Sequence, residues 1–79
     1  MEVKREKNEL MARVGRNIAA ERIRRDMSQE ELADAVGLAR MTIINYEAGL
    51  TTPDMASATA IADVLGVSLD ALAGREPPG

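Results

Sequence analysis

The chain has 79 residues, which is enough for one small domain, and a domain of this length buries only about 60% of the surface of its unfolded chain. It contains no cysteine, which excludes disulfides and thiolate metal sites, and no histidine, so an enzyme would have to rely on carboxylates, lysine, serine or tyrosine. The net charge of −3 by itself argues against a polyanionic partner.

The charge is unevenly distributed along the chain. Residues 1–25 hold eight basic and four acidic residues, a net of +4, whereas residues 26–79 hold two basic and nine acidic residues, a net of −7. A cationic N-terminal part followed by an anionic remainder is compatible with a protein that turns one side to DNA. The alternative is that these charges only form solvated helix faces.

Residues 1–9, MEVKREKNE, alternate in charge and contain few apolar positions. We expect them to form a charged N-terminal arm, either frayed or helical. They are too charged for a secretory signal, and no apolar run in the chain approaches the roughly 20 residues of a membrane span. We therefore expect a cytoplasmic protein.

The next segment predicts a helix over about residues 10–25. Its apolar residues, among them Leu10, Val14 and Ile18, follow the 3.6-residue spacing of one helix face. Gly15 lies inside this helix, where glycine costs up to about 1 kcal/mol relative to alanine, so another helix is expected to approach closely there. Asp26 is expected to end the helix.

Residues 28–49 predict two short helices joined by a tight turn. Ser28 and Glu31 have the spacing of a capping box, which starts a helix over residues 29–36. Gly37 ends that helix, because glycine adopts the left-handed conformation without a Cβ penalty. A second helix follows over about residues 40–48 and is closed by Gly49. Two helices joined by about four residues with a glycine make a helix-turn-helix.

The remainder predicts two more helices. Pro53 disfavours helix in the residue before it, and Asp54 is a good N-cap for an alanine-rich helix over residues 55–65. Gly66 closes that helix, and Ser68 caps a last short helix over residues 69–73. Residues 74–79 read as a disordered tail. The expected architecture is all-α, with a single domain over residues 10–73.

Several motifs in this order resemble one family. They are QEELA from Gln29, the Thr42-Ile43 pair, Tyr46-Glu47-x-Gly49, Thr52-Pro53 and the run from Leu65 to Leu72. Over roughly residues 14–73 the chain resembles the phage-repressor/Cro helix-turn-helix family, also called the xenobiotic-response-element family. The resemblance implies a compact five-helix repressor-like DNA-binding domain whose helix 40–48 enters the major groove.

Helix 40–48 carries two apolar stripes, and both cannot enter one small core. Periodicity alone does not say which is inward, but the resemblance places Ile43 and Tyr46 inside and leaves the base-reading residues facing out. Asparagine can bond adenine, arginine can bond guanine, and isoleucine or methionine can pack on a thymine methyl. The alternative is that Met41 and Ile44 form a dimer or partner surface. The expected base-reading residues, with Ile44 solvent-exposed, are Arg40, Met41, Ile44 and Asn45.

A second set is expected to contact the DNA backbone. The resemblance gives Gln29 the role of touching a phosphate and bracing the reading helix, although glutamine is also an ordinary first-turn residue. It further pairs Arg22 with Glu47, which ties the first helix to the end of the reading helix, and Arg22 could also reach a phosphate. The expected backbone contacts are Gln29, Arg22, Thr42, Thr51 and Thr52.

Two departures from the family weaken the expected binding. Ala39 stands where the family often has a serine or threonine cap, and alanine cannot accept the cap bond. The loop after Gly49 reads Leu50-Thr51-Thr52 and lacks the usual cations. Fewer phosphate contacts release fewer counterions, so weak and salt-sensitive binding by the monomer is expected.

These observations predict a transcriptional regulator that binds duplex DNA as a homodimer. We expect it to act as a repressor. No enzymatic activity, cofactor or metal is expected. Dimerisation is expected to use the surface near residues 69–73 or the arm. The alternative is a protein-interaction module of the same fold, such as an antitoxin-like protein, whose exposed Met41 and Ile44 face a protein partner.

Overall fold

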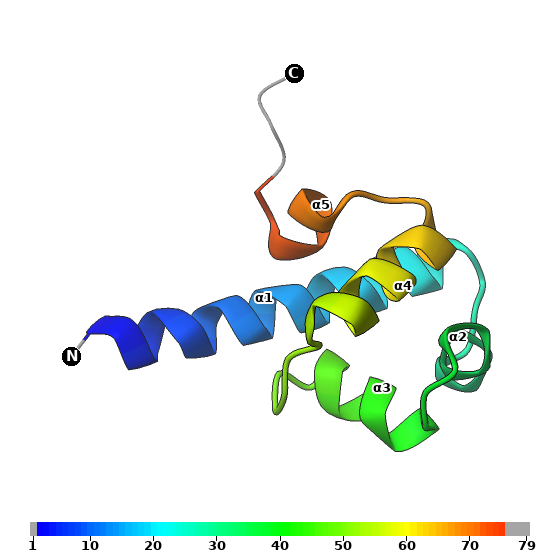
Figure 1. Ribbon diagram of the computed structural model, residues 1–79, viewed down its shortest axis with the longest axis horizontal. Coiled ribbons are helices and arrows are strands. Elements are labelled where there is room, and N and C mark those ends of the chain that lie inside the picture. The colour runs from blue at the N-terminus through cyan, green and yellow to red at the C-terminus, as the bar shows by residue number, and fades with distance from the viewer. Residues whose placement is uncertain (1, 76–79) are drawn as a thin grey trace.

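The computed structural model describes the backbone of residues 2–75 and the side chains from Lys7 onward. This part of the chain is all-helical and contains no strand, which confirms the expected all-α fold (Figure 1). Its five helices are α1 (Glu2–Arg24), α2 (Gln29–Val36), α3 (Arg40–Glu47), α4 (Met55–Leu65) and α5 (Leu69–Ala73).

Local capping signals set the bounds of α2, α4 and α5, as predicted. At the start of α2, the Ser28 hydroxyl accepts the Glu31 N–H at 2.9 Å and a Glu31 carboxylate oxygen accepts the Ser28 N–H at 2.7 Å. The Asp54 carboxylate accepts the Ser57 N–H at 2.8 Å at the start of α4. That bond lowers the pKa of Asp54 below its ordinary value, because it favours the charged form.

Helix α1 is longer than predicted. It begins at Glu2 instead of about residue 10, so the expected arm continues the helix, and Figure 1 shows it projecting beyond the other helices. The physical reason is that residues 2–9 include no glycine or proline and several good helix formers, so nothing interrupts the helix. Within residues 2–75, no helix combines the length and apolarity needed to cross a membrane.

The buried core lies where α1 crosses the other helices. Ile18, Leu32, Ile43, Ile61 and Leu65 are the largest side chains with no exposure. Each of the first four helices contributes at least one of them, so the core joins α1, both helices of the turn motif and α4. This packing fixes the side of α3 that faces inward.

Gly15 sets the distance between α1 and α3. A Cβ at this position would collide with the backbone carbonyl oxygen of Tyr46 and lie 2.9 Å from that of Glu47. Both oxygens belong to the last turn of α3, so they cannot move aside as a flexible side chain could. The close helix approach predicted from this glycine is confirmed, and α3 is its source.

Helix α5 is hydrogen-bonded to α1 by two side chains whose role the sequence did not predict. The Arg13 guanidinium donates to the Ala73 carbonyl at 2.8 Å, and the Asn17 amide donates to the Leu72 carbonyl at 2.9 Å. Gly74 then caps the helix, and residues 76–79 of the expected tail lie outside the described residues.

Candidate nucleic-acid interface

Helix α3 presents two sides of different character. Ile43 is fully buried and Tyr46 nearly so, which confirms the inward side, while Arg40 is exposed and Met41 is 60% exposed. Successive residues of a helix are 100° apart about its axis, so Met41 and Asn45 lie on the side opposite Ile43. Asn45 is half-buried there. The side opposite Ile43 therefore combines one amide and one apolar side chain, and the exposed cation Arg40 stands at the first position of the helix.

Ile44 is not the solvent-exposed residue that was expected. It is half-buried in the free protein, as is Thr42. The reason is geometric, because a residue next to the fully buried Ile43 is turned by only about 100° and so lies at the flank of the helix. Ile44 therefore borders both the core and the outward side, and it is less available than Met41.

The start of α3 is electrostatically different from the start of α2. The first turn of α2 carries Glu30 and Glu31, whereas the first turn of α3 carries no acidic residue and begins with exposed Arg40. Ala39 makes no side-chain cap bond, as the sequence indicated. Backbone N–H groups and the helix dipole make a helix start attractive to anions, and at α3 no carboxylate opposes this.

The C-terminal end of α3 is held by a single carboxylate that joins three elements. Glu47 accepts Arg22 Nε at 2.7 Å and Arg22 Nη2 at 3.0 Å, and it also accepts the Gln29 amide at 3.0 Å. Arg22 donates further to the Met27 carbonyl at 2.7 Å. The predicted pair of Arg22 and Glu47 and the bracing role of Gln29 are both present in this geometry.

This network is largely shielded from water. The side chains of Arg22 and Glu47 are only 12% and 8% exposed, respectively. Hydrogen bonding to Glu47 raises the pKa of the Arg22 guanidinium above its ordinary value, so this side chain stays charged at neutral pH. Three of the five N–H groups of Arg22 are directed to protein oxygens, which leaves two for any phosphate.

The Gln29 amide is likewise directed to Glu47, and two carboxylates follow it in the first turn of α2. Thr51 and Thr52 are exposed in the loop after α3, and the Thr51 N–H donates to the Asn45 carbonyl at 3.4 Å. The sequence did not predict the hydrogen bond from Arg22 to the Met27 carbonyl, because any residue type supplies a backbone acceptor.

The described residues hold no group of three or more acidic side chains that could bind a metal ion. Every buried side-chain nitrogen or oxygen among them has a hydrogen-bond partner. The buried polar side chains of the described residues are therefore all used within the fold, and a partner would meet polar groups of the surface.

Comparison of the sequence with models of known families also identifies the helix-turn-helix. A family model described as helix-turn-helix matches residues 18–72, which is more than half of the chain. The chain belongs to this helix-turn-helix family. The family, of the Cro and C1 type, is one of DNA-binding regulatory domains, so this chain is a DNA-binding transcription regulator.

A solved structure shares the fold of this helix-turn-helix domain. The restriction-modification controller protein C.AhdI from Aeromonas hydrophila matches with a TM-score of 0.75 and 24% sequence identity, over 78% of this chain and 94% of that chain. None of the curated proteins compared with the chain is a significant match. The family match begins at Ile18, so the first two-thirds of α1 precede it.

Proposed function

We propose that this protein represses transcription by binding a specific duplex site as a two-fold dimer in the cytoplasm, with α3 in the major groove. The observation that supports this most strongly is the division of α3. Its inward side and its terminal carboxylate are used for packing and bracing, while Arg40, Met41 and Asn45 face outward. A helix that is held by packing and hydrogen bonds on one side and exposed on the other can present its side chains to DNA bases in a fixed geometry.

The outward side chains match the edges of particular base pairs. Asn45 offers an amide that can bond adenine in two places, and Arg40 can bond the two acceptors of guanine. Met41, with Ile44 beside it, offers apolar surface to a thymine methyl. The proposed half-site therefore contains A·T pairs opposite the middle of α3 and a G·C pair opposite its start.

The backbone contacts of the proposed complex are few. Thr42, Thr51 and Thr52 would donate to phosphates, and Gln29 and Arg22 would do so with the donors that Glu47 leaves free. The affinity of one copy should therefore be low and should fall as salt is added, with a slope of about −0.9 per phosphate contact. Binding by two copies compensates for this weakness.

Selection of bound duplexes from a random library tests the proposal and gives the half-site spacing. Met41→Ala and Asn45→Ala should each weaken binding to the selected site by about 1–3 kcal/mol and relax preference at one base pair. Ile23→Ala is a matched control, because Ile23 on α1 is 61% exposed, like Met41, but lies outside the turn motif. Equal effects of all three variants would contradict the assignment of α3.

A second function is favoured by one observation, the exposed apolar side chain of Met41 beside an acidic overall charge. The same side of α3 could bind a protein partner. The two functions respond differently to salt, since phosphate contacts weaken steeply with ionic strength and apolar contacts do not. A library that yields no enriched duplex, together with salt-insensitive capture of a protein through Met41, would favour the second function.

A further inference from the structure

Sulfur occurs in this chain only as the thioether of methionine. The sequence has five methionines and no cysteine. Oxidants such as hydrogen peroxide modify thiols and thioethers in proteins, so in this chain that reaction falls on methionine. The methionines whose side chains the structure describes are Met11, Met27, Met41 and Met55.

These four side chains differ in their access to solvent. Met11 and Met27 are half-buried, and Met27 packs against the hydrophobic core. Met41 is 60% exposed and Met55 is 71% exposed. A dissolved oxidant reaches a sulfur atom only where water reaches it, so Met41 and Met55 should react before the other two.

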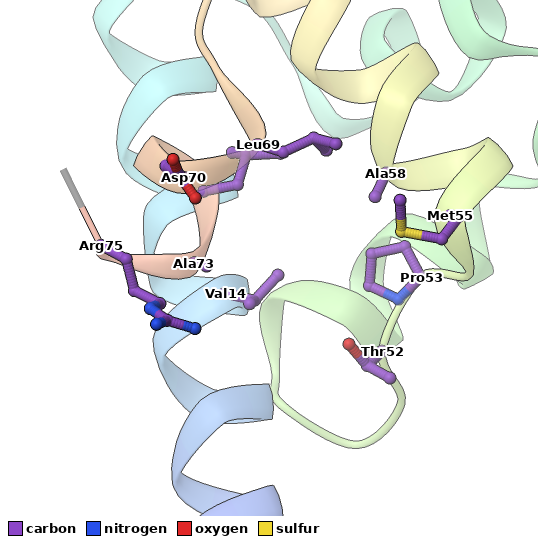
Figure 2. Close-up of a pocket in the computed structure, with 10 residues that line it drawn as sticks. Val14, Thr52, Pro53, Met55, Ala58, Leu69, Asp70, Ala73 and Arg75 are labelled. Atoms are coloured by element: carbon purple, nitrogen blue, oxygen red, sulfur yellow. The ribbon is translucent and has the colours of Figure 1, made fainter. Parts of the chain in front are cut away.

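The two exposed methionines lie in different parts of the fold. Met41 is the second residue of α3, on the side opposite Ile43. Met55 is the first residue of α4, and Figure 2 shows it beside a groove between α4 and α5. None of the described residues that line this groove belongs to α3. Oxidation of Met55 therefore leaves the surface of α3 unchanged, and it provides a control within the same molecule.

We propose that Met41 is an oxidative modification site through which peroxide releases this protein from DNA. The peroxide transfers one oxygen atom to the thioether, so an S–O bond forms while the O–O bond breaks. The sulfur is oxidised by two electrons, and the peroxide is reduced to water, which keeps both hydrogens. The inference rests on the proposed function, because it needs α3 in the major groove.

The sulfoxide changes what Met41 offers to a base pair. A thioether packs on a thymine methyl, whereas a sulfoxide oxygen is a hydrogen-bond acceptor, and the methyl group has no donor for it. Burying that oxygen against the methyl therefore removes its water without replacing the lost hydrogen bonds. In the free protein the same oxygen stays hydrated, because the side chain is exposed. The modification should weaken the complex and leave the fold intact.

The modification is also reversible. Methionine sulfoxide reductases return the sulfoxide to the thioether, with one enzyme for each of the two sulfoxide epimers. Treatment with both enzymes should restore binding. A reversible change on an exposed reading residue would link occupancy of the DNA site to the oxidant concentration.

Partial oxidation of the wild-type chain gives a test that needs no variant. The full chain is treated with hydrogen peroxide and mixed with a limiting amount of selected duplex that carries one half-site, so pairing between copies does not affect the result. Peptide mass analysis then compares the free and bound fractions. The ratio of Met41 sulfoxide to unmodified Met41 should be at least about tenfold higher in the free fraction, whereas Met55 sulfoxide should be equally distributed.

Two variants provide a second measurement. Met41→Leu and Met55→Leu each replace a thioether by an apolar side chain of similar volume that peroxide does not modify. Each variant is compared with itself before and after oxidation. The Kd of Met55→Leu should rise by at least about tenfold and return after reductase treatment, whereas that of Met41→Leu should keep its starting value. Met1 is present in both variants, so its oxidation cannot produce the difference.

Several results would overturn the proposal. They are an equal distribution of Met41 sulfoxide between the two fractions, oxidation of Met41 no faster than that of Met27, and a loss of helical circular dichroism on oxidation of Met55→Leu. The proposed function has a separate control. Absence of duplex binding before any oxidant is added would refute the DNA-reading function and the modification site together, whereas normal binding that survives oxidation of Met41 would refute the modification site alone.

Discussion

Replacing Gly15 by alanine tests how closely α3 is held against α1. In an ordinary helix interior this change is stabilising by about 0.5–1 kcal/mol, because glycine has more backbone freedom to lose on folding. Here the added Cβ would collide with the Tyr46 carbonyl oxygen and lie 2.9 Å from that of Glu47. Local helix propensity and tertiary packing therefore predict effects of opposite sign.

The loss of stability from the packing collision should exceed the gain from helix propensity. Adding one carbon to a tightly packed contact costs about 1–3 kcal/mol, and the upper part of that range applies because the obstacle is backbone. After the gain in helix propensity, the net loss should be about 2 kcal/mol. For a domain of this size each kcal/mol shifts the melting temperature by about 4–8 °C, so Gly15→Ala should melt about 8–16 °C below the wild type.

Thermal unfolding followed by circular dichroism measures this shift. Ala20→Gly is the matched control, because Ala20 is an exposed α1 position where only helix propensity acts and a loss of up to about 1 kcal/mol is expected. A Gly15→Ala variant that melts at or above the wild-type temperature would refute the close contact. Below its melting point the variant should also bind DNA more weakly, since α3 must shift to make room.

Three further predictions concern single residues. Arg22→Ala and Glu47→Ala should each destabilise the fold, and a double-mutant cycle should give an interaction energy of about 0.5–3 kcal/mol; strict additivity would show that the pair is not coupled. Ile43→Ala should cost about 2–5 kcal/mol and Ile44→Ala clearly less, as urea unfolding would show, and the reverse order would mean that α3 is rotated about its axis. Asp54→Ala should lower the melting temperature at neutral pH, because it removes the cap of α4. The pKa of Asp54 is lowered in the folded state, so its contribution to the free energy of unfolding is present above the ordinary value of 3.8 and disappears as the pH falls through the lowered value. A difference in melting temperature between wild type and variant that persists at lower pH would contradict the cap.

The helix bounds that could be predicted are those set by local chemistry. Ser28, Asp54 and Ser68 accept N–H groups three residues later, and the glycines that follow α2 and α4 adopt positive φ, so short sequence patterns carry this information. Asp26 ends α1 in the same left-handed region at φ 55° without being glycine. The start of α1 carries no such signal, so the sequence left the arm as either frayed or helical, and the structure has the helical form from Glu2 onward.

The orientation of α3 was predictable only in part. Two stripes of apolar residues left the inward side open, and only the family resemblance selected Ile43 and Tyr46. The half-buried state of Ile44 depends on how far the neighbouring helices reach around α3, which no local pattern records. Arg13 and Asn17 were missed for a related reason, since their partners are carbonyl groups more than fifty residues away in the chain.

The separation of bracing from reading on α3 has a consequence for how this domain could diversify. The Glu47 carboxylate bonds to α1 and α2, whereas the side chains of Met41 and Asn45 make no hydrogen bond or ion pair with the described part of the chain. Substitutions at the outward positions should therefore leave the scaffold intact. A lineage could exchange one operator for another through a few codon changes without passing through an unfolded intermediate, and a protein engineer could retarget the domain by the same route.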